Sequence, residues 1–170
     1  TADITIDPAK TTTAEFAWTR VFQGTYDGQG YTIYGQSVNS SKGAGTCGAF
    51  VSLDGATLKN ITVADTHYAG WGASSLLAKA IYNTKFENCK FRIDAMRSVT
   101  PSVTSSKDSG WISFGLFMNN KVNNCVFDAK GIAMGNIFGS GANFANNTFA
   151  DSVLLTKSLV SIFTRNDVAT

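Results

Sequence analysis

A short pattern of apolar and polar positions recurs along the chain: an apolar residue, any residue, Asn, two further residues, and a second apolar residue. Its copies are residues 58–63, 86–91, 122–127 and 144–149. A second apolar pattern precedes each copy, at residues 48–50, 75–77, 115–117 and 136–138, and appears again at 161–163. Two patterns that keep the same order four times indicate an internal repeat.

The repeated segments alternate in polarity and are rich in Phe, Val, Ile and Thr, which is typical of short strands rather than helices. The asparagines of successive copies are 28, 36 and 22 residues apart, which leaves room for two or three short strands per repeat. One such unit cannot bury its apolar face, whereas a parallel stack can. The pattern therefore predicts an all-β fold, a parallel β-helix of about six coils, with each coil about 4.8 Å above the last.

The recurring asparagines are expected at sharp bends between strands, because Asn tolerates the left-handed backbone region. Their amides would then bond from coil to coil in a ladder, although ordinary turn residues would give the same sequence. The expected ladder is Asn60, Asn88, Asn124 and Asn146. The expected interior stacks are Leu58, Phe86, Val122 and Phe144, and then Val63, Phe91, Phe127 and Phe149.

The uneven spacing predicts long loops. The extra residues fall at 64–74 and 93–114, each between an Asn motif and the next apolar strand. Both loops should leave the same side of the stack, and loops on one face of a repeat array are commonly its binding face.

The chain divides into an N-terminal strand and cap over residues 1–20 and a β-helix over residues 21–170. Residues 3–8 are expected to form the strand and residues 9–18 the cap. Ile33-Tyr34-Gly35 aligns with Leu58-Lys59-Asn60, so the first coil is placed at 21–35. The last coil, begun at 161–163, is expected to be incomplete.

A longer motif resembles a known family. Residues 22–35 read F-x-G-x-Y-D-G-x-G-Y-x-I-x-G, followed by G-x-F at 48–50 and A-x-L-x-N-I-x-V at 56–63. This is similar to right-handed parallel β-helix modules, including the GLUG-type repeats of bacterial surface proteins and the domains of phage fibres. The resemblance implies adhesins, stalks or fibre domains, while larger pectate-lyase-like relatives are enzymes.

The composition of the chain argues against several classes of function. The 170 residues are 44% hydrophobic and 15% charged, with a net charge of +2. No basic block points to nucleic acid, and no apolar run approaches the roughly 20 residues of a membrane span. His67 is the only histidine, so no metal site and no cofactor are expected.

Catalysis on this fold would need acids at equivalent positions of neighbouring coils. Asp65, Asp94, Asp128 and Asp151 are candidates for an outward acidic row, which Lys59, Lys90 and Arg92 could neutralise. A solvated row of scattered ion pairs is the favoured interpretation.

The loop aromatics are the better candidates for ligand binding. Trp71, with His67 and Tyr68, lies in the first long loop and Trp111 in the second. Such rings stack on sugars or on protein surfaces, unless they fold back onto the coils. Cys89 and Cys125 share one phase on consecutive coils, so either a disulfide or two stacked thiols is expected there.

The expected function is a non-catalytic structural and adhesive module of a secreted, cell-surface or virion-surface assembly. Its partners would be copies of itself or adjoining domains at the coil ends, and a surface glycan at the loops. A carbohydrate-active enzyme domain and a purely structural spacer are the alternatives.

Overall fold

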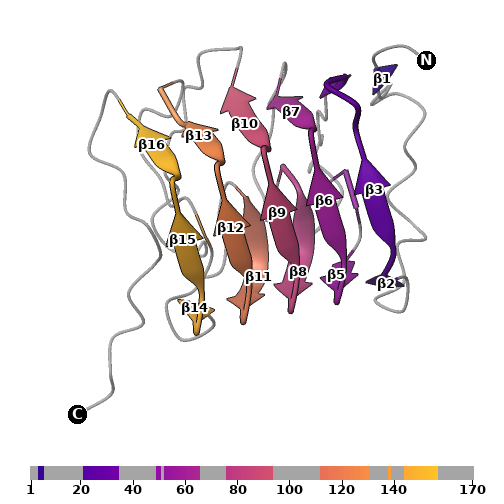
Figure 1. Cartoon of the computed structure of the whole chain (residues 1–170), viewed down its shortest axis with the longest axis vertical. Coiled ribbons are helices and arrows are strands. Elements are labelled where there is room, and N and C mark those ends of the chain that lie inside the picture. Colours follow the sequence, from indigo (N-terminus) through magenta and orange to yellow (C-terminus); the bar gives the residue numbers. More distant parts are fainter. Residues whose placement is uncertain are drawn as a thin grey trace, which may run out of the picture.

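The computed structural model describes residues 4–5, 21–34, 49–50, 52–65, 76–93, 112–130, 138 and 144–156. The regular elements in these residues are all short strands, arranged as three parallel sheets (Figure 1). The strands are β1 (Ile4–Thr5), β2 (Val21–Phe22), β3 (Thr25–Asp27), β4 (Thr32–Tyr34), β5 (Ser52–Asp54), β6 (Thr57–Lys59), β7 (Thr62–Asp65), β8 (Ala78–Tyr82), β9 (Lys85–Glu87), β10 (Lys90–Ile93), β11 (Ser113–Met118), β12 (Lys121–Asn123), β13 (Val126–Asp128), β14 (Phe144–Ala145), β15 (Thr148–Ala150) and β16 (Val153–Leu155).

The chain visits the three sheets in a fixed order. Sheet A contains β1, β4, β7, β10, β13 and β16; sheet B contains β2, β5, β8, β11 and β14; and sheet C contains β3, β6, β9, β12 and β15. Each coil therefore runs through sheet B, then sheet C, then sheet A, and pairs in parallel with the coil before it. The expected parallel β-helix is confirmed, and the described residues form five three-stranded coils with β1 as an extra strand of sheet A.

Each strand of the five described coils contributes one inward residue to the centre of the core, because successive side chains in a strand point to opposite faces. The register aligns these residues in three interior rows: Phe22, Leu53, Ile81, Phe117 and Phe144 in sheet B; Tyr26, Leu58, Phe86, Val122 and Phe149 in sheet C; and Ile33, Val63, Phe91, Phe127 and Leu154 in sheet A. In the second, third and fourth coils every member of these rows is at most 5% exposed.

Two predicted stacks are correct in their first three members and wrong in the fourth. Val122 pairs with Phe149, not with Phe144, and Phe127 pairs with Leu154, not with Phe149. Phe144 instead pairs with Phe117 of sheet B. The reason is that both corners of a coil carry the same sequence pattern, and the copy at 144–149 lies at the other corner.

Two further predicted alignments are wrong. Tyr26-Asp27, and not Ile33-Tyr34, pairs with Leu58-Lys59, while Ile33 pairs with Val63. In the apolar pattern before each motif, Phe117 is level with Ile81 and not with Leu77. Leu77 instead accepts a backbone hydrogen bond from Phe50, as the pattern predicts for that pair.

The two ends of the chain are only partly described. β1 lies inside the predicted strand at 3–8 and pairs with Ile33 and Tyr34. The predicted cap at 9–18 and the final pattern at 161–163 lie outside the described residues. No helix among the described residues has the length and hydrophobicity needed to cross a membrane.

Candidate functional site: asparagine corners and the loop edge

Each coil turns sharply at two corners, one between sheets B and C and one between sheets C and A. In the second to fifth coils the first residue of each corner adopts a left-handed backbone, with φ of 71° at Gly55, 50° at Asp151, and between 47° and 56° at Asn83, Asn119, Asn146, Asn60, Asn88 and Asn124. Asn is the common non-glycine residue in this region because its short polar side chain tolerates it. The second residue of each corner points into the coil.

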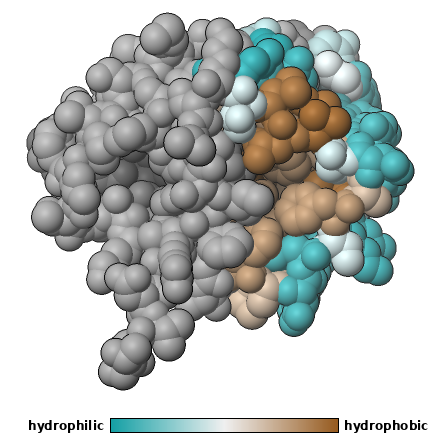
Figure 2. All heavy atoms as spheres, turned by 90° about the vertical axis from the view of Figure 1, so that its left-hand side faces the viewer, coloured by the Kyte–Doolittle hydropathy of each residue, from teal (hydrophilic) through white to brown (hydrophobic). Residues whose placement is uncertain are grey.

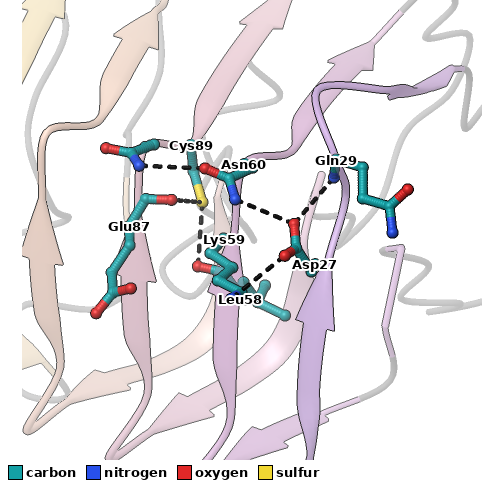
Figure 3. Close-up of polar contacts among 8 residues, drawn as sticks. Asp27, Gln29, Leu58, Lys59, Asn60, Glu87 and Cys89 are labelled. Atoms are coloured by element: carbon teal, nitrogen blue, oxygen red, sulfur yellow. Dashed lines mark hydrogen bonds and ion pairs between the residues drawn. The ribbon is translucent and has the colours of Figure 1, made fainter.

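The corner between sheets C and A carries the predicted ladder. Asn124 Nδ2 donates to Asn88 Oδ1 at 2.8 Å, and Asn88 Nδ2 donates to Asn60 Oδ1 at 3.1 Å. Asn60 Nδ2 then donates to Asp27 Oδ1 at 3.0 Å (Figure 3). Three of the four asparagines expected in this ladder are therefore in it. The position equivalent to Asn124 in the next coil is Asp151, whose φ is 50°.

The corner between sheets B and C carries a second ladder, which the sequence interpretation missed. Asn146 Nδ2 donates to Asn119 Oδ1 at 3.2 Å, Asn119 to Asn83 at 3.3 Å, and Asn83 to Asp54 Oδ1 at 2.8 Å. Placing Asn146 in the first ladder was wrong. The sequence does contain a signal for this second ladder, because Asn83, Asn119 and Asn146 each lie five positions before the first residue of the other corner.

Both ladders end at an aspartate that is followed by glycine. All amide N–H groups point toward the first coils, so a carboxylate there receives the aligned dipoles, as at the positive end of a helix. Gly28 is required next to Asp27, because a Cβ on residue 28 would lie 2.7 Å from the carbonyl oxygen of Asn60. Lys59 Nζ, 3.3 Å from Asp27 Oδ2, adds a positive charge (Figure 3).

The amide of Asn60 and the backbone N–H of Gln29 hold the pKa of Asp27 below its ordinary value of 3.8. Both groups bond to the ionised form. Because the folded-state pKa is the lower one, this contribution to stability is present above about pH 3.8 and is lost as the pH falls through the folded-state value.

We expect that Asn60→Gly will raise the pKa of Asp27 toward 3.8, because glycine keeps the left-handed turn but removes the amide donor. An NMR titration of the Asp27 carboxyl carbon measures this directly. Asn124→Gly, which removes an amide two coils beyond Asn60, is the matched control and should leave the pKa of Asp27 unchanged, given the short range of such bonds. An unchanged pKa in Asn60→Gly would contradict the role assigned to the amide.

At the corner between sheets B and C, the inward residues Thr84, Asn120 and Asn147 form a polar strip inside the stack. The backbone N–H of Thr84 donates to Asn120 Oδ1 at 2.9 Å, and that of Asn120 donates to Asn147 Oδ1 at 3.0 Å. Asn120 Nδ2 donates to the carbonyl of Ile81 at 3.2 Å. The side chains of Asn120 and Asn147 thus accept hydrogen bonds from backbone N–H groups that the turn leaves without a backbone partner.

The same inward position at the other corner holds the two cysteines, which are buried and not bonded to each other. The backbone N–H of Cys89 donates to Cys125 Sγ at 3.4 Å, and Cys89 Sγ donates to the carbonyl of Leu58 at 3.3 Å. The neighbouring thiol of Cys125 and burial raise the pKa of Cys89. A protonated, buried thiol is a weak nucleophile. Stacked thiols are therefore the correct choice between the two expected states.

The third edge of the coil carries the connections from sheet A to sheet B. Residues 66–77 join β7 to β8, and residues 94–112 join β10 to β11. β7 and β10 are neighbours in sheet A, and β8 and β11 are neighbours in sheet B. Long connections therefore leave one edge of the stack, as the spacing predicts. The candidate ligand-binding residues His67, Tyr68, Trp71 and Trp111 lie in these connections, outside the described residues.

The candidate acidic row does not form among the described acids. Asp65 is level with Ile93, Asp128 is level with Arg92, and Asp151 lies at a corner. Asp128 is 3.3 Å from Lys130 in an ion pair. Asp94 lies outside the described residues. In the part of the chain that the structure describes, no three His, Cys, Asp or Glu side chains are placed to hold a metal ion.

Comparisons of the chain with protein-family models, with curated proteins and with solved structures gave no match.

Proposed function

We propose that this chain is a non-catalytic structural and adhesive module of a secreted, cell-surface or virion-surface assembly. The observation that supports this most is the stack of five coils in the described residues, in which every long connection runs from a strand of sheet A to a strand of sheet B. A similarity to GLUG-type repeats and phage fibre domains, which rests on residues 22–35 and 48–63, agrees with this role.

The stack suits mechanical support because each coil is fixed to its neighbours in three independent ways. Backbone hydrogen bonds join the coils at their corners as well as along the strands, as from Lys90 to Ile61 at 2.8 Å and from Lys121 to Thr84 at 2.9 Å. The two amide ladders and the three interior rows run along the same axis. Stability then accumulates from nearest-neighbour contacts, as in other repeat proteins.

The loop edge is the proposed adhesive surface. Trp71 and Trp111, with Tyr68 and His67 beside the first, would contact the ligand, and a glycan is the proposed ligand because flat aromatic rings stack on sugar rings. Repetition of loops on adjacent coils would present several contacts to one extended chain.

A glycan-binding screen with the intact chain tests this function. Trp71→Ala and Trp111→Ala are expected to weaken binding of a captured glycan at least tenfold, since a stacked aromatic is a typical hot spot. Tyr31→Ala, which removes an aromatic that is 38% exposed and lies outside the loops, is the matched control and should bind normally.

The same glycans, scored for cleavage products, test the alternatives. Turnover that is lost in Asp128→Ala would replace the proposal with a carbohydrate-active enzyme. Absence of both binding and turnover would leave a purely structural spacer as the function.

A further inference from the structure

The two buried cysteines occupy a position that a serine fills in the next coil. Cys125 Sγ accepts a hydrogen bond from the backbone N–H of Cys89 at 3.4 Å and donates to the carbonyl of Asn123 at 3.2 Å. Ser152 Oγ accepts from the N–H of Cys125 at 3.1 Å and donates to the carbonyl of Ala150 at 2.9 Å. A hydroxyl therefore makes the same two bonds at this corner as a thiol, so the hydrogen bonding of the corner does not itself require sulfur.

The two thiols contact each other inside the stack. Cys89 and Cys125 directly precede Lys90 and Val126, which are level in sheet A. Their side chains hydrogen-bond to each other, and the two residues are 2% and 0% exposed. Cys89 Sγ also reaches the carbonyl of Glu87 at 3.4 Å (Figure 3). Neighbouring parallel strands are about 4.8 Å apart, which lies within the Cα separations of about 4.4–6.8 Å that disulfides span.

The pair lies close to the least buried coil of the stack. Cys125 is one coil from β14, β15 and β16, the last strands of their sheets among the described residues. Phe149 and Leu154 of that coil are 44% and 41% exposed, and Figure 2, which views this end, shows apolar residues gathered at the surface. A coil with so few buried side chains opens more readily than the buried coils. A small oxidant therefore reaches Cys125 when this one coil opens.

The two thiols differ in their readiness to ionise. The side chain of Cys89 and then its backbone N–H both bond to Cys125 Sγ and lower the pKa of Cys125. The same thiol contact and burial raise the pKa of Cys89. Because the thiolate is the nucleophile, Cys125 reacts first and Cys89 acts second.

We propose that Cys89 and Cys125 form a redox-active pair, which peroxide converts to a disulfide between the third and fourth coils. The Cys125 thiolate attacks one oxygen of hydrogen peroxide and breaks the O–O bond, which gives a sulfenic acid and hydroxide. The hydroxide takes up the proton that Cys125 has lost. The sulfur of Cys89 then attacks the sulfenic sulfur, and the hydroxyl group leaves as water with the proton of Cys89. Two thiols are thus oxidised to one disulfide, and one hydrogen peroxide is reduced to two waters.

The disulfide would hold two coils together where backbone hydrogen bonds already join them. Its two residues are 36 positions apart, and residues 94–112, the longer of the two long connections, lie between them. A bridge across such a loop restricts the unfolded chain and so favours the folded one. The inference is independent of the proposed function, because a chain that binds no glycan keeps the same pair.

Peptide mapping of the intact, folded chain before and after treatment with hydrogen peroxide tests this pair. We expect a peptide that links Cys89 to Cys125 and a chain mass that is lower by two hydrogen atoms. The midpoint of thermal unfolding should rise by at least about 4 °C, as for a typical bridge in a chain of this size. Dithiothreitol should reverse both changes.

Two variants serve as matched controls. Cys125→Ser should fold as the reduced parent does, because Ser152 makes the same bonds in the next coil. Peroxide should neither link this variant nor raise its melting temperature. Cys47→Ala removes the third cysteine of the chain and should still form the link. If Cys125→Ser does not fold, the mapping in the unaltered chain and in Cys47→Ala decides the question.

Every other outcome contradicts the proposal. Sulfinic acid at either cysteine without a link, a link to Cys47, or no reaction of the folded chain would show that the two sulfurs are not placed to join. A linked chain that melts at or below the temperature of the reduced chain would show that the bridge does not fit the stack.

Discussion

Phe117→Ala is expected to lower the free energy of unfolding by about 3–5 kcal/mol, the usual range for deleting a buried aromatic ring. Phe117 is 2% exposed and occupies the middle of the aromatic interior. Its ring lies 4.3 Å from that of Phe138, 5.7 Å from Phe144 and 6.1 Å from Phe86. The deletion would leave a cavity shared by several strands, which the closely spaced backbones cannot close.

Chemical denaturation of the purified chain measures this loss. Phe149→Ala is the matched control, because the same atoms are removed from a ring that is 44% exposed. Its effect should be about half or less, in proportion to the area buried. Equal effects would mean that the interior is not packed as described.

Asn120→Ala is expected to destabilise the fold by about 1–3 kcal/mol, because it leaves the buried N–H of Thr84 without its partner. Asn120 is 1% exposed, and its amide serves the N–H of Thr84 and the carbonyl of Ile81. The alanine methyl group can replace neither bond.

Asn123→Ala is the matched control for that substitution, since Asn123 lies three residues further on and is exposed on β12. Its effect should stay within about 0.5 kcal/mol, as for ordinary surface positions. A loss below 1 kcal/mol in Asn120→Ala would show that the inward amide does not hold the corner.

The repeat could be predicted from the sequence because the corner geometry is strict. A residue with a left-handed backbone followed by an inward residue recurs as Asn60-Ile61, Asn88-Cys89 and Asn124-Cys125. This recurrence was enough to predict the coils, the first ladder and the sheet A row as far as Phe127. The pattern could not distinguish the two corners, since both impose the same backbone. Asn146 was therefore assigned to the wrong ladder, and Asn83 and Asn119 were missed.

Residues that substitute for Asn at the corners were also hard to recognise. Asp151 occupies a ladder position, and Asp27 and Asp54 receive the terminal amides, yet in the sequence each resembles an ordinary turn aspartate. Asn120 likewise looks like a second turn residue, although its side chain is buried. Only the register shows which coil each of these side chains faces.

The stacking of coils is tested most directly by NMR detection of scalar couplings across backbone hydrogen bonds. The structure requires a coupling from the nitrogen of Lys90 to the carbonyl carbon of Ile61, and from Val126 to Cys89 and Val153 to Cys125, each one coil apart. Observation of all three would establish parallel coils in the described register. Couplings that instead join these strands in antiparallel order would contradict the β-helix itself.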